Sequence, residues 1–126
     1  MDRRLAMAAT VGSAIGLLFA ARASAQTQAG MKTEVDFLLG SIVYSGCEFY
    51  RNGSWHSGAA AQAHLRLKYD TLLAGRQLTT TEQFIDLVAT KSSFSGQAYR
   101  VRCEKVADTS SRQWMHEQLA RYRASR

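Results

Sequence analysis

Residues 45–56 read Ser-Gly-Cys-Glu-Phe-Tyr-Arg-Asn-Gly-Ser-Trp-His, and this stretch decides most of the fold. Its Asn52-Gly53 pair supplies the two positive-φ residues that a type I′ turn requires, so it predicts a tight β-hairpin. The turn also fixes the register of the two strands, in which three pairs face each other: Phe49 with His56, Tyr50 with Trp55 and Arg51 with Ser54. Gly46 is placed just past the end of a preceding helix, where a left-handed cap is expected.

Side chains alternate between the two faces of a strand, so the hairpin has two different surfaces. Its inner face is predicted to carry Cys47, Phe49, Arg51, Ser54 and His56, and its outer face Tyr50 and Trp55. Tyr50 and Trp55 form a cross-strand aromatic pair that stabilises the hairpin or, equally, offers a stacking surface to a sugar or a partner protein.

Two helices are predicted to flank the hairpin. The first follows a polar lead, Gln26 to Gly30, and its buried positions recur at helical spacing: Met31, Val35, Leu38, Leu39, Ile42 and Val43. Glu34 and Asp36 are expected near its start, where negative charge suits the helix dipole. The second is capped by Ser57, runs to about Ala74 and is closed by Gly75.

Thr79 and Glu82 read as a capping box that opens a third helix, with Phe84, Ile85, Leu87 and Val88 buried. Residues 91–97 are predicted to form a loop. Tyr99, Val101 and Cys103 alternate with arginines, which is typical of a half-buried strand. Residues 104–109 are expected to be a loop, and Ser110 or Ser111 to cap a last helix whose apolar side holds Trp114, Met115, Leu119 and Tyr122.

The resulting order, α-β-β-α-α-β-α, predicts a small α+β domain with helices packed on one face of a three-stranded antiparallel sheet. The two cysteines, Cys47 and Cys103, are predicted to form one disulfide within it. The alternative of a redox-active pair lacks the Cys-x-x-Cys spacing.

The first 25 residues have the pattern of a secretory signal peptide. A basic start at Arg3 and Arg4 precedes an apolar run, and Ala23-Ser24-Ala25 fits the small-x-small cleavage rule. We expect cleavage after Ala25, which leaves residues 26–126 as one periplasmic domain. The apolar run is short for a permanent membrane anchor, which is the alternative reading.

The charge argues against one class of partner and leaves another open. The chain carries a net charge of +6, which falls to +4 when the leader with its three arginines and one aspartate is removed. Export makes nucleic acid an unexpected partner, whereas an anionic ligand or protein of the envelope fits a mildly basic domain. The alternative is that the charge only aids solubility.

No pattern of metal ligands or cofactor-binding residues is present. His116-Glu117 begins a zinc-protease helix motif, but Ala120 stands where the second histidine is required. Three histidines at positions 56, 64 and 116 have no recognisable metal spacing, so neither a metal nor a cofactor is expected.

The remaining candidates for chemistry are polar residues beside apolar faces. We expect Arg51, His56, His64, Lys68, Ser93 and Ser95 to form a ligand site that suits an anionic group. The alternatives are that His64 and Lys68 make ordinary structural contacts and that the serines are turn formers. A small hydrolase that uses Ser93 or Ser95 with His64 is the second hypothesis, although no Gly-x-Ser-x-Gly or Ser-x-x-Lys motif supports it.

The chain resembles a known family across roughly residues 32–122. The matching elements are Ser45-Gly46-Cys47, Phe49, Arg51-Asn52-Gly53, His64-Leu65, Lys68-Tyr69, Thr81, Phe84-Ile85, Lys91-Ser92-Ser93, Ser95-Gly96, Tyr99, Cys103 and Trp114. Together they resemble the YfeK-like family of small exported bacterial proteins. Tyr50 and Ala98 depart from it, in place of an aliphatic residue and a proline. The resemblance implies a periplasmic setting, and because the family is a domain of unknown function, it transfers no substrate and no catalytic residues. From the polar residues beside apolar faces we predict a non-enzymatic binding or interaction domain.

Overall fold

The computed structural model describes residues 26–126, so the predicted signal peptide lies outside the described residues. Its elements follow in the order α2 (Gln28–Tyr44), β1 (Glu48–Arg51), β2 (Ser54–His56), α3 (Gly58–Ala74), α4 (Thr81–Leu87), β3 (Arg100–Cys103), β4 (Val106–Ser110) and α5 (Ser111–Ala124). Within residues 26–126, no helix combines the length and the hydrophobicity needed to cross a membrane.

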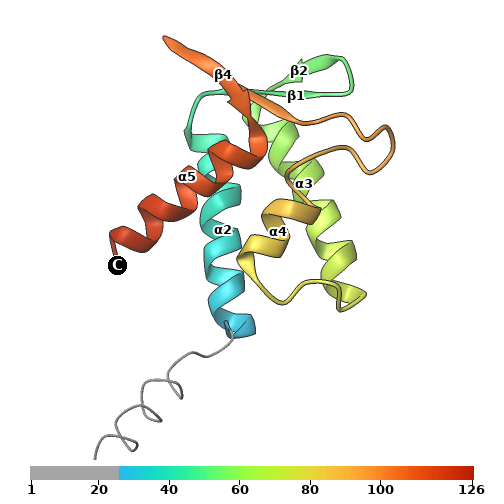
Figure 1. Ribbon diagram of the computed structural model, residues 1–126, viewed down its shortest axis with the longest axis vertical. Helices are drawn as coiled ribbons and strands as arrows, with labels where there is room; N and C mark the ends of the chain where they lie inside the picture. The colour runs from blue at the N-terminus through green and yellow to red at the C-terminus, as the bar shows by residue number, and fades with distance from the viewer. Residues whose placement is uncertain (1–25) are drawn as a thin grey trace, which may run out of the picture.

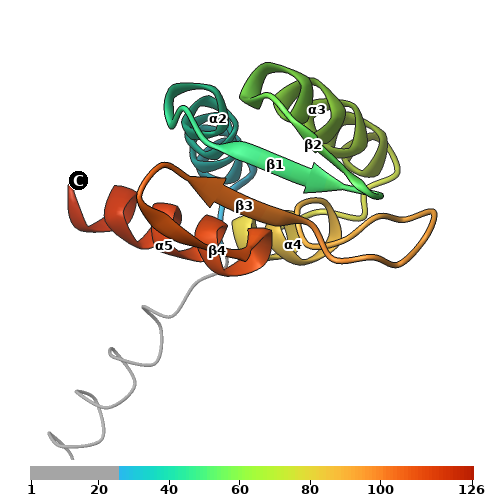
Figure 2. The same cartoon turned by 90° about the horizontal axis from the view of Figure 1, so that it is seen from above.

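The four strands form one antiparallel sheet with the order β2-β1-β3-β4. The helices pack against one face of this sheet and leave the opposite face uncovered (Figures 1 and 2). The predicted α+β class, with helices on one face of a small antiparallel sheet, is therefore confirmed.

The hairpin forms with the predicted register, in which Phe49 pairs with His56, Tyr50 with Trp55 and Arg51 with Ser54. Asn52 and Gly53 take φ values of 49° and 92°, the left-handed conformation that the turn requires. Two local residues thus determine which side chains face the helices.

The predicted loop over residues 104–109 is wrong, because most of it belongs to β4. A left-handed turn at Lys105, with φ 63°, reverses the chain so that β4 pairs with β3. The sequence Val-Ala-Asp-Thr-Ser of β4 has no alternation of apolar and polar residues, and most of its side chains are exposed. The sheet therefore has four strands rather than three.

Helix α2 begins earlier than predicted. Thr27 is its N-cap and accepts a hydrogen bond from the Gly30 backbone N–H, so most of the predicted polar lead is helical. Glu34 and Asp36 consequently lie beyond the first turn, and their predicted role at the helix dipole is wrong. Val43, predicted to be buried, is 39% exposed.

The other helices confirm some predicted boundaries and correct others. Ser57 caps α3 and Gly75 ends it, as predicted, and Ser110 is the cap of α5. The capping box of α4 uses Thr80 and Gln83 instead of Thr79 and Glu82. In α4, Leu87 is exposed although Phe84, Ile85 and Val88 are buried as predicted.

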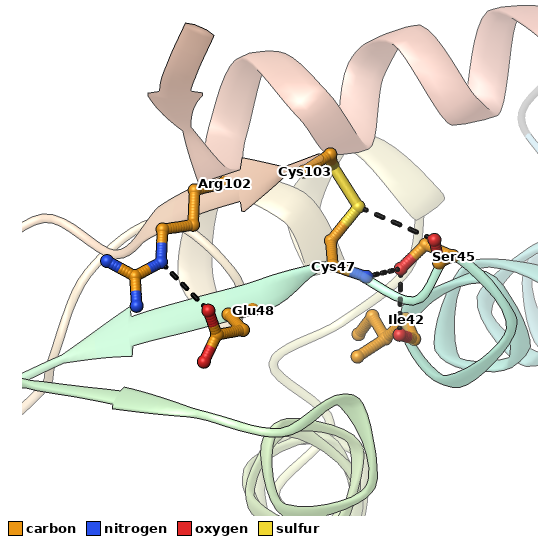
Figure 3. The surroundings of a disulfide bond; sticks show 6 residues. All are labelled: Ile42, Ser45, Cys47, Glu48, Arg102 and Cys103. Carbon is orange, nitrogen blue, oxygen red and sulfur yellow. Dashed lines mark hydrogen bonds and ion pairs between the residues drawn. A yellow bond between two sulfur atoms is a disulfide. The ribbon is translucent and has the colours of Figure 1, made fainter. Parts of the chain in front are cut away.

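The predicted disulfide between Cys47 and Cys103 is confirmed and joins the start of β1 to the end of β3 (Figure 3). The two Cα atoms lie 4.4 Å apart, as in a cross-strand pair without backbone hydrogen bonds. Beside the bond, the Ser45 hydroxyl accepts a hydrogen bond from the Cys47 backbone N–H and donates one to the Ile42 carbonyl. The bond therefore connects the end of α2, β1 and β3.

The core lies between the sheet and the helices. Its sheet side is formed by Phe49, Val101 and Tyr99, and its helix side includes Leu65 and Trp114. The Phe49 and Trp114 rings meet edge to face, with centroids 5.6 Å apart. This packing holds the inner face of β1 directly over α3 and α5.

A buried carboxylate ties the helices together far from the hairpin. Glu34 is 1% exposed and forms a two-point ion pair with Arg123, with both N···O distances 2.8 Å. It also accepts hydrogen bonds from Thr81 and Gln26, at 2.7 Å each. The Glu34 carboxylate thus connects Gln26, α2, α4 and α5.

Candidate functional site

Four basic side chains gather where the hairpin packs on α3. Arg51 and His56 come from the inner face of the hairpin, because the strand alternation directs them there. His64 and Lys68 come from α3 and are four residues apart, so they lie on one helix face. The predicted site residues Arg51, His56, His64 and Lys68 are therefore brought together.

A small hollow lies at the centre of this group. It has a volume of about 20 Å³, and its lining comes from both strands of the hairpin, α3, the residue before β3 and α5: Phe49, Tyr50, Arg51, His56, Ala61, His64, Leu65, Tyr99 and Ser111. Lys68 is not among the lining residues. We call it the cationic hollow. This volume has room for a single water-sized group. The basic side chains that line it are partly exposed, so solvent reaches them.

Tyr99 connects the two basic side chains of α3. Its hydroxyl lies 3.1 Å from His64 Nε2 and accepts a hydrogen bond from Lys68 Nζ at 3.2 Å. Lys68 Nζ also donates to the Lys91 carbonyl at 3.1 Å. Because Lys68 donates to the tyrosine oxygen, the tyrosine proton is free to bond Nε2 of a neutral His64. Sequence reasoning placed Tyr99 in the strand but missed its place in the site.

The basic side chains of this group lie close enough together to shift one another's pKa values. Burial lowers the pKa of His64, and the nearby charges of Arg51, Lys68 and His56 lower it further. Burial also lowers the pKa of Lys68, with a further contribution from Arg51. Burial raises the pKa of the Tyr99 hydroxyl. His64 and Lys68 therefore lie in an environment that disfavours their charged forms.

Within the described part of the chain, no ion pair offsets the charge of this group. Among residues 26–126, none of the ion pairs includes Arg51, His56, His64 or Lys68. A cluster of basic groups beside apolar walls is costly when unpaired. An oxyanion placed at the hollow would supply the missing opposite charge.

The predicted serines lie outside the hollow, on the loop of residues 91–97, which we call the serine loop. Its buried member is Ser92, whose hydroxyl accepts hydrogen bonds from Asn52 Nδ2, Phe94 N and Ser95 N at 3.1–3.2 Å. The Ser95 hydroxyl in turn donates to Asn52 Oδ1. Ser95 thus fastens the loop to the hairpin turn, and Ser93 is exposed.

These contacts do not give a nucleophile and base pair. His64 contacts Tyr99, and no hydrogen bond of the described residues joins His64 to Ser93 or Ser95. Ser92, which sequence reasoning did not include in the site, carries most of the loop's hydrogen bonds. Its position before Ser-Phe-Ser is typical of a serine turn, which is the signal that identifies it.

No metal centre is formed by the part of the chain that the structure describes. Within it, no three His, Cys, Asp or Glu side chains are grouped so that they can hold a metal ion. The basic side chains at the hollow suit an anion and not a cation.

The outer face of the hairpin carries the predicted aromatic pair. The Tyr50 and Trp55 rings meet with centroids 5.4 Å apart. The Arg102 guanidinium lies 4.0 Å from the centre of the Trp55 ring and pairs with Glu48 at 2.9 Å. Part of the Trp55 ring is therefore already covered by contacts within the protein.

Comparisons with known proteins identify relatives but no activity. Residues 29–123 match the model of DUF5329, a family of unknown function. The chain is 33% identical over 90 residues to the uncharacterized protein YfeK of Salmonella typhimurium, a match that covers 71% of this chain and 73% of the relative. No solved structure matches the chain.

Proposed function

Since the chain belongs to DUF5329, a family of unknown function, we propose its role from its own geometry: a non-enzymatic binding domain that recognises an anionic group at the cationic hollow. Arg51, His56 and His64 contact the ligand, and Lys68 adds charge behind them. The setting that we propose is the bacterial periplasm, reached by the signal peptide of residues 1–25.

The observation that carries this proposal is the uncompensated basic group. Arg51, His56, His64 and Lys68 converge from the hairpin and α3, and none of them has an acidic partner among residues 26–126. Proteins pair the charges that they bury, so a partly buried basic group without an acidic partner supports a ligand that arrives from solution.

The size of the hollow defines what enters it. About 20 Å³ accommodates one oxygen of a phosphate, sulfate or carboxylate, and the remaining atoms stay at the mouth. Arg51 is suited to that position, because a guanidinium presents several N–H donors in a plane that matches an oxyanion. The apolar walls from Phe49, Ala61 and Leu65 strengthen such contacts by excluding water.

The hydrolase hypothesis has less support. It needs a serine within hydrogen-bond reach of a base, and the Ser95 hydroxyl is hydrogen-bonded to Asn52. No hydrogen bond of the described residues joins Ser93 or Ser95 to His64. Binding is therefore the function that the geometry favours.

Titration with inorganic phosphate, followed by two-dimensional amide NMR, tests the proposal. We expect saturable shifts at Arg51, His56, His64 and Tyr99 that weaken strongly in Arg51→Gln. Arg121→Gln, which removes an exposed arginine of α5, is the matched control and should bind as the wild type does. Equal, unsaturable shifts at all arginines would overturn the proposal.

A further inference from the structure

One fully exposed aromatic side chain lies at the end of the molecule that carries the basic group. Phe94 is 98% exposed, more than any other large apolar residue of the described chain. Exposed single apolar residues are common, but a large aromatic ring left in water forgoes the free energy of burial. The Phe94 ring is therefore available to a binding partner.

The loop that carries Phe94 is fixed rather than loose. The Ser92 hydroxyl accepts the Phe94 and Ser95 backbone N–H groups, and backbone hydrogen bonds link Ser92 to Gly96 and to Gln97. Asn52 joins the same loop to the hairpin turn through Ser92 and Ser95. A side chain on a fixed loop loses less conformational entropy when it binds a partner.

Basic residues lie in this loop and next to it. Lys91 is exposed, and its carbonyl accepts the hydrogen bond from Lys68. Arg51 precedes Asn52, which contacts the loop directly. In both views the serine loop, drawn in orange, projects beyond the turn of the β1–β2 hairpin at the same end of the molecule (Figures 1 and 2).

We propose that this end of the molecule binds an anionic lipid surface, with the Phe94 ring inserted at the headgroup level, Lys91 and Arg51 facing the headgroups and Lys68 adding charge behind them. Phenylalanine is among the apolar residues that interfacial segments bury at the boundary between headgroups and acyl chains, and lysine and arginine are attracted to anionic headgroups. The projecting Phe94 ring provides the apolar insertion, and the nearby basic residues provide the attraction to the headgroups.

A protein partner fits these observations less well. Stable protein interfaces bury a broad patch with a central apolar cluster. The other exposed large apolar residues are scattered over other elements: Val43 and Tyr44 on α2, Leu67 on α3, Leu87 on α4 and Val106 on β4. A lipid surface needs no such patch.

The inference rests on the proposed function in one respect only, which is that a lipid phosphate occupies the cationic hollow. The test uses residues 26–126 and sedimentation with vesicles of phosphatidylcholine alone or with 30% phosphatidylglycerol. We expect binding to the anionic vesicles only, decreasing with added salt. Phe94→Ser should weaken it roughly tenfold by removing one buried apolar side chain.

Tyr44→Ser is the matched control, because Tyr44 is an aromatic residue that is 90% exposed but lies on α2. It should bind vesicles as the wild type does, and Phe94→Ser should still bind inorganic phosphate. Phosphate binding without vesicle binding would overturn this inference and leave the proposed function standing. Vesicle binding that depends on Phe94 in a protein that does not bind phosphate would overturn the proposed function, and with it the lipid phosphate in the hollow, but would support the insertion of Phe94. Equal losses of vesicle binding in Phe94→Ser and Tyr44→Ser would show that exposed aromatic residues promote binding nonspecifically, and would also overturn this inference.

Discussion

Glu34 shows how much a single buried side chain can contribute to this fold. Its hydrogen bonds from Arg123, and those from Thr81 and Gln26, lower its pKa from 4.5 to about 2, against the opposing effect of burial. Arg123 also binds Glu82 at 2.8 Å, so one guanidinium joins two carboxylates. The contacts connect residues that are 89 positions apart in the chain.

A depressed carboxyl pKa makes stability depend on pH in one direction. The contribution of Glu34 is fully present above pH 4.5, the unfolded value, and is lost as the pH falls toward 2. Because Arg123 is 37% exposed, solvent screens part of the interaction, so we expect a contribution on the order of 2 kcal/mol.

Urea unfolding between pH 2.5 and 7 checks this expectation. The free energy of unfolding of the wild type should fall on acidification, and Glu34→Gln should remove the largest part of that fall. Glu117→Gln alters an exposed carboxylate of α5 and should leave the profile unchanged. An unaltered acid dependence in Glu34→Gln would contradict the role given to this residue.

His64 provides a second test at the scale of one residue. Burial is the main cause of its lowered pKa, and Arg51 is the next. Arg51→Gln should therefore raise the pKa of His64 part of the way back toward 6.5, because the burial remains.

Proton NMR of the imidazole Cε1–H as a function of pH measures this value directly. The same titration of Arg121→Gln provides the reference, since that arginine lies on α5. A His64 pKa that does not respond to Arg51→Gln would show that the two side chains are not electrostatically coupled.

Among the structural elements, the hairpin and β3 depend on the disulfide. The bond closes a loop with a sequence separation of 56 residues, for which chain entropy gives about 4 kcal/mol. The double variant Cys47→Ala/Cys103→Ala should lose about that amount of unfolding free energy.

Urea unfolding of oxidised wild type, reduced wild type and the double variant measures the loss. The reduced wild type should behave like the double variant, because both lack only the cross-link. Unfolding midpoints that are the same with and without the bond would contradict this prediction.

The hairpin turn and the serine loop depend on each other through Asn52. Asn52→Gly retains a residue that accepts the left-handed turn but loses the contacts to Ser92 and Ser95, whereas Asn52→Ala loses both. We expect the glycine variant to keep the hairpin and to release the loop, and the alanine variant to cost roughly 1 kcal/mol more.

Amide hydrogen exchange separates the two effects. In Asn52→Gly the Phe94 and Ser95 amides should exchange faster while those of β1 and β3 stay protected. Unchanged exchange at Phe94 and Ser95 would show that Asn52 does not hold the loop.

For the whole molecule, the sequence predicts what local chemistry determines. Asn52-Gly53 is sufficient to predict the turn and the hairpin register, and two cysteines in one chain leave a single pairing. The strand β4 could not be predicted, because its residues carry no periodic pattern and it exists through its pairing with β3. The bond between Glu34 and Arg123 depends on how α2 and α5 meet, which no local pattern contains.

In the candidate site, too, some features follow from local sequence and others from the packing of distant segments. The inward direction of Arg51 and His56 follows from strand alternation, and His64 and Lys68 share a helix face by their spacing. The bridging position of Tyr99 and the attachment of Ser92 and Ser95 to Asn52 depend on how distant segments pack. The sequence predicts Ser93 and Ser95 in the ligand site. The hydrogen bond from Ser95 to Asn52 instead makes Ser95 a support of the loop, and Ser93 is exposed.

The central claim for the whole molecule is that the cationic hollow receives an oxyanion. Crystals of residues 26–126 grown at low salt and soaked in tungstate would show the anion directly by its anomalous scattering. We expect the strongest peak at the mouth of the hollow, with oxygens within hydrogen-bond distance of Arg51 and His64. Peaks confined to other basic residues, such as Arg121, with none at the hollow, would contradict the account.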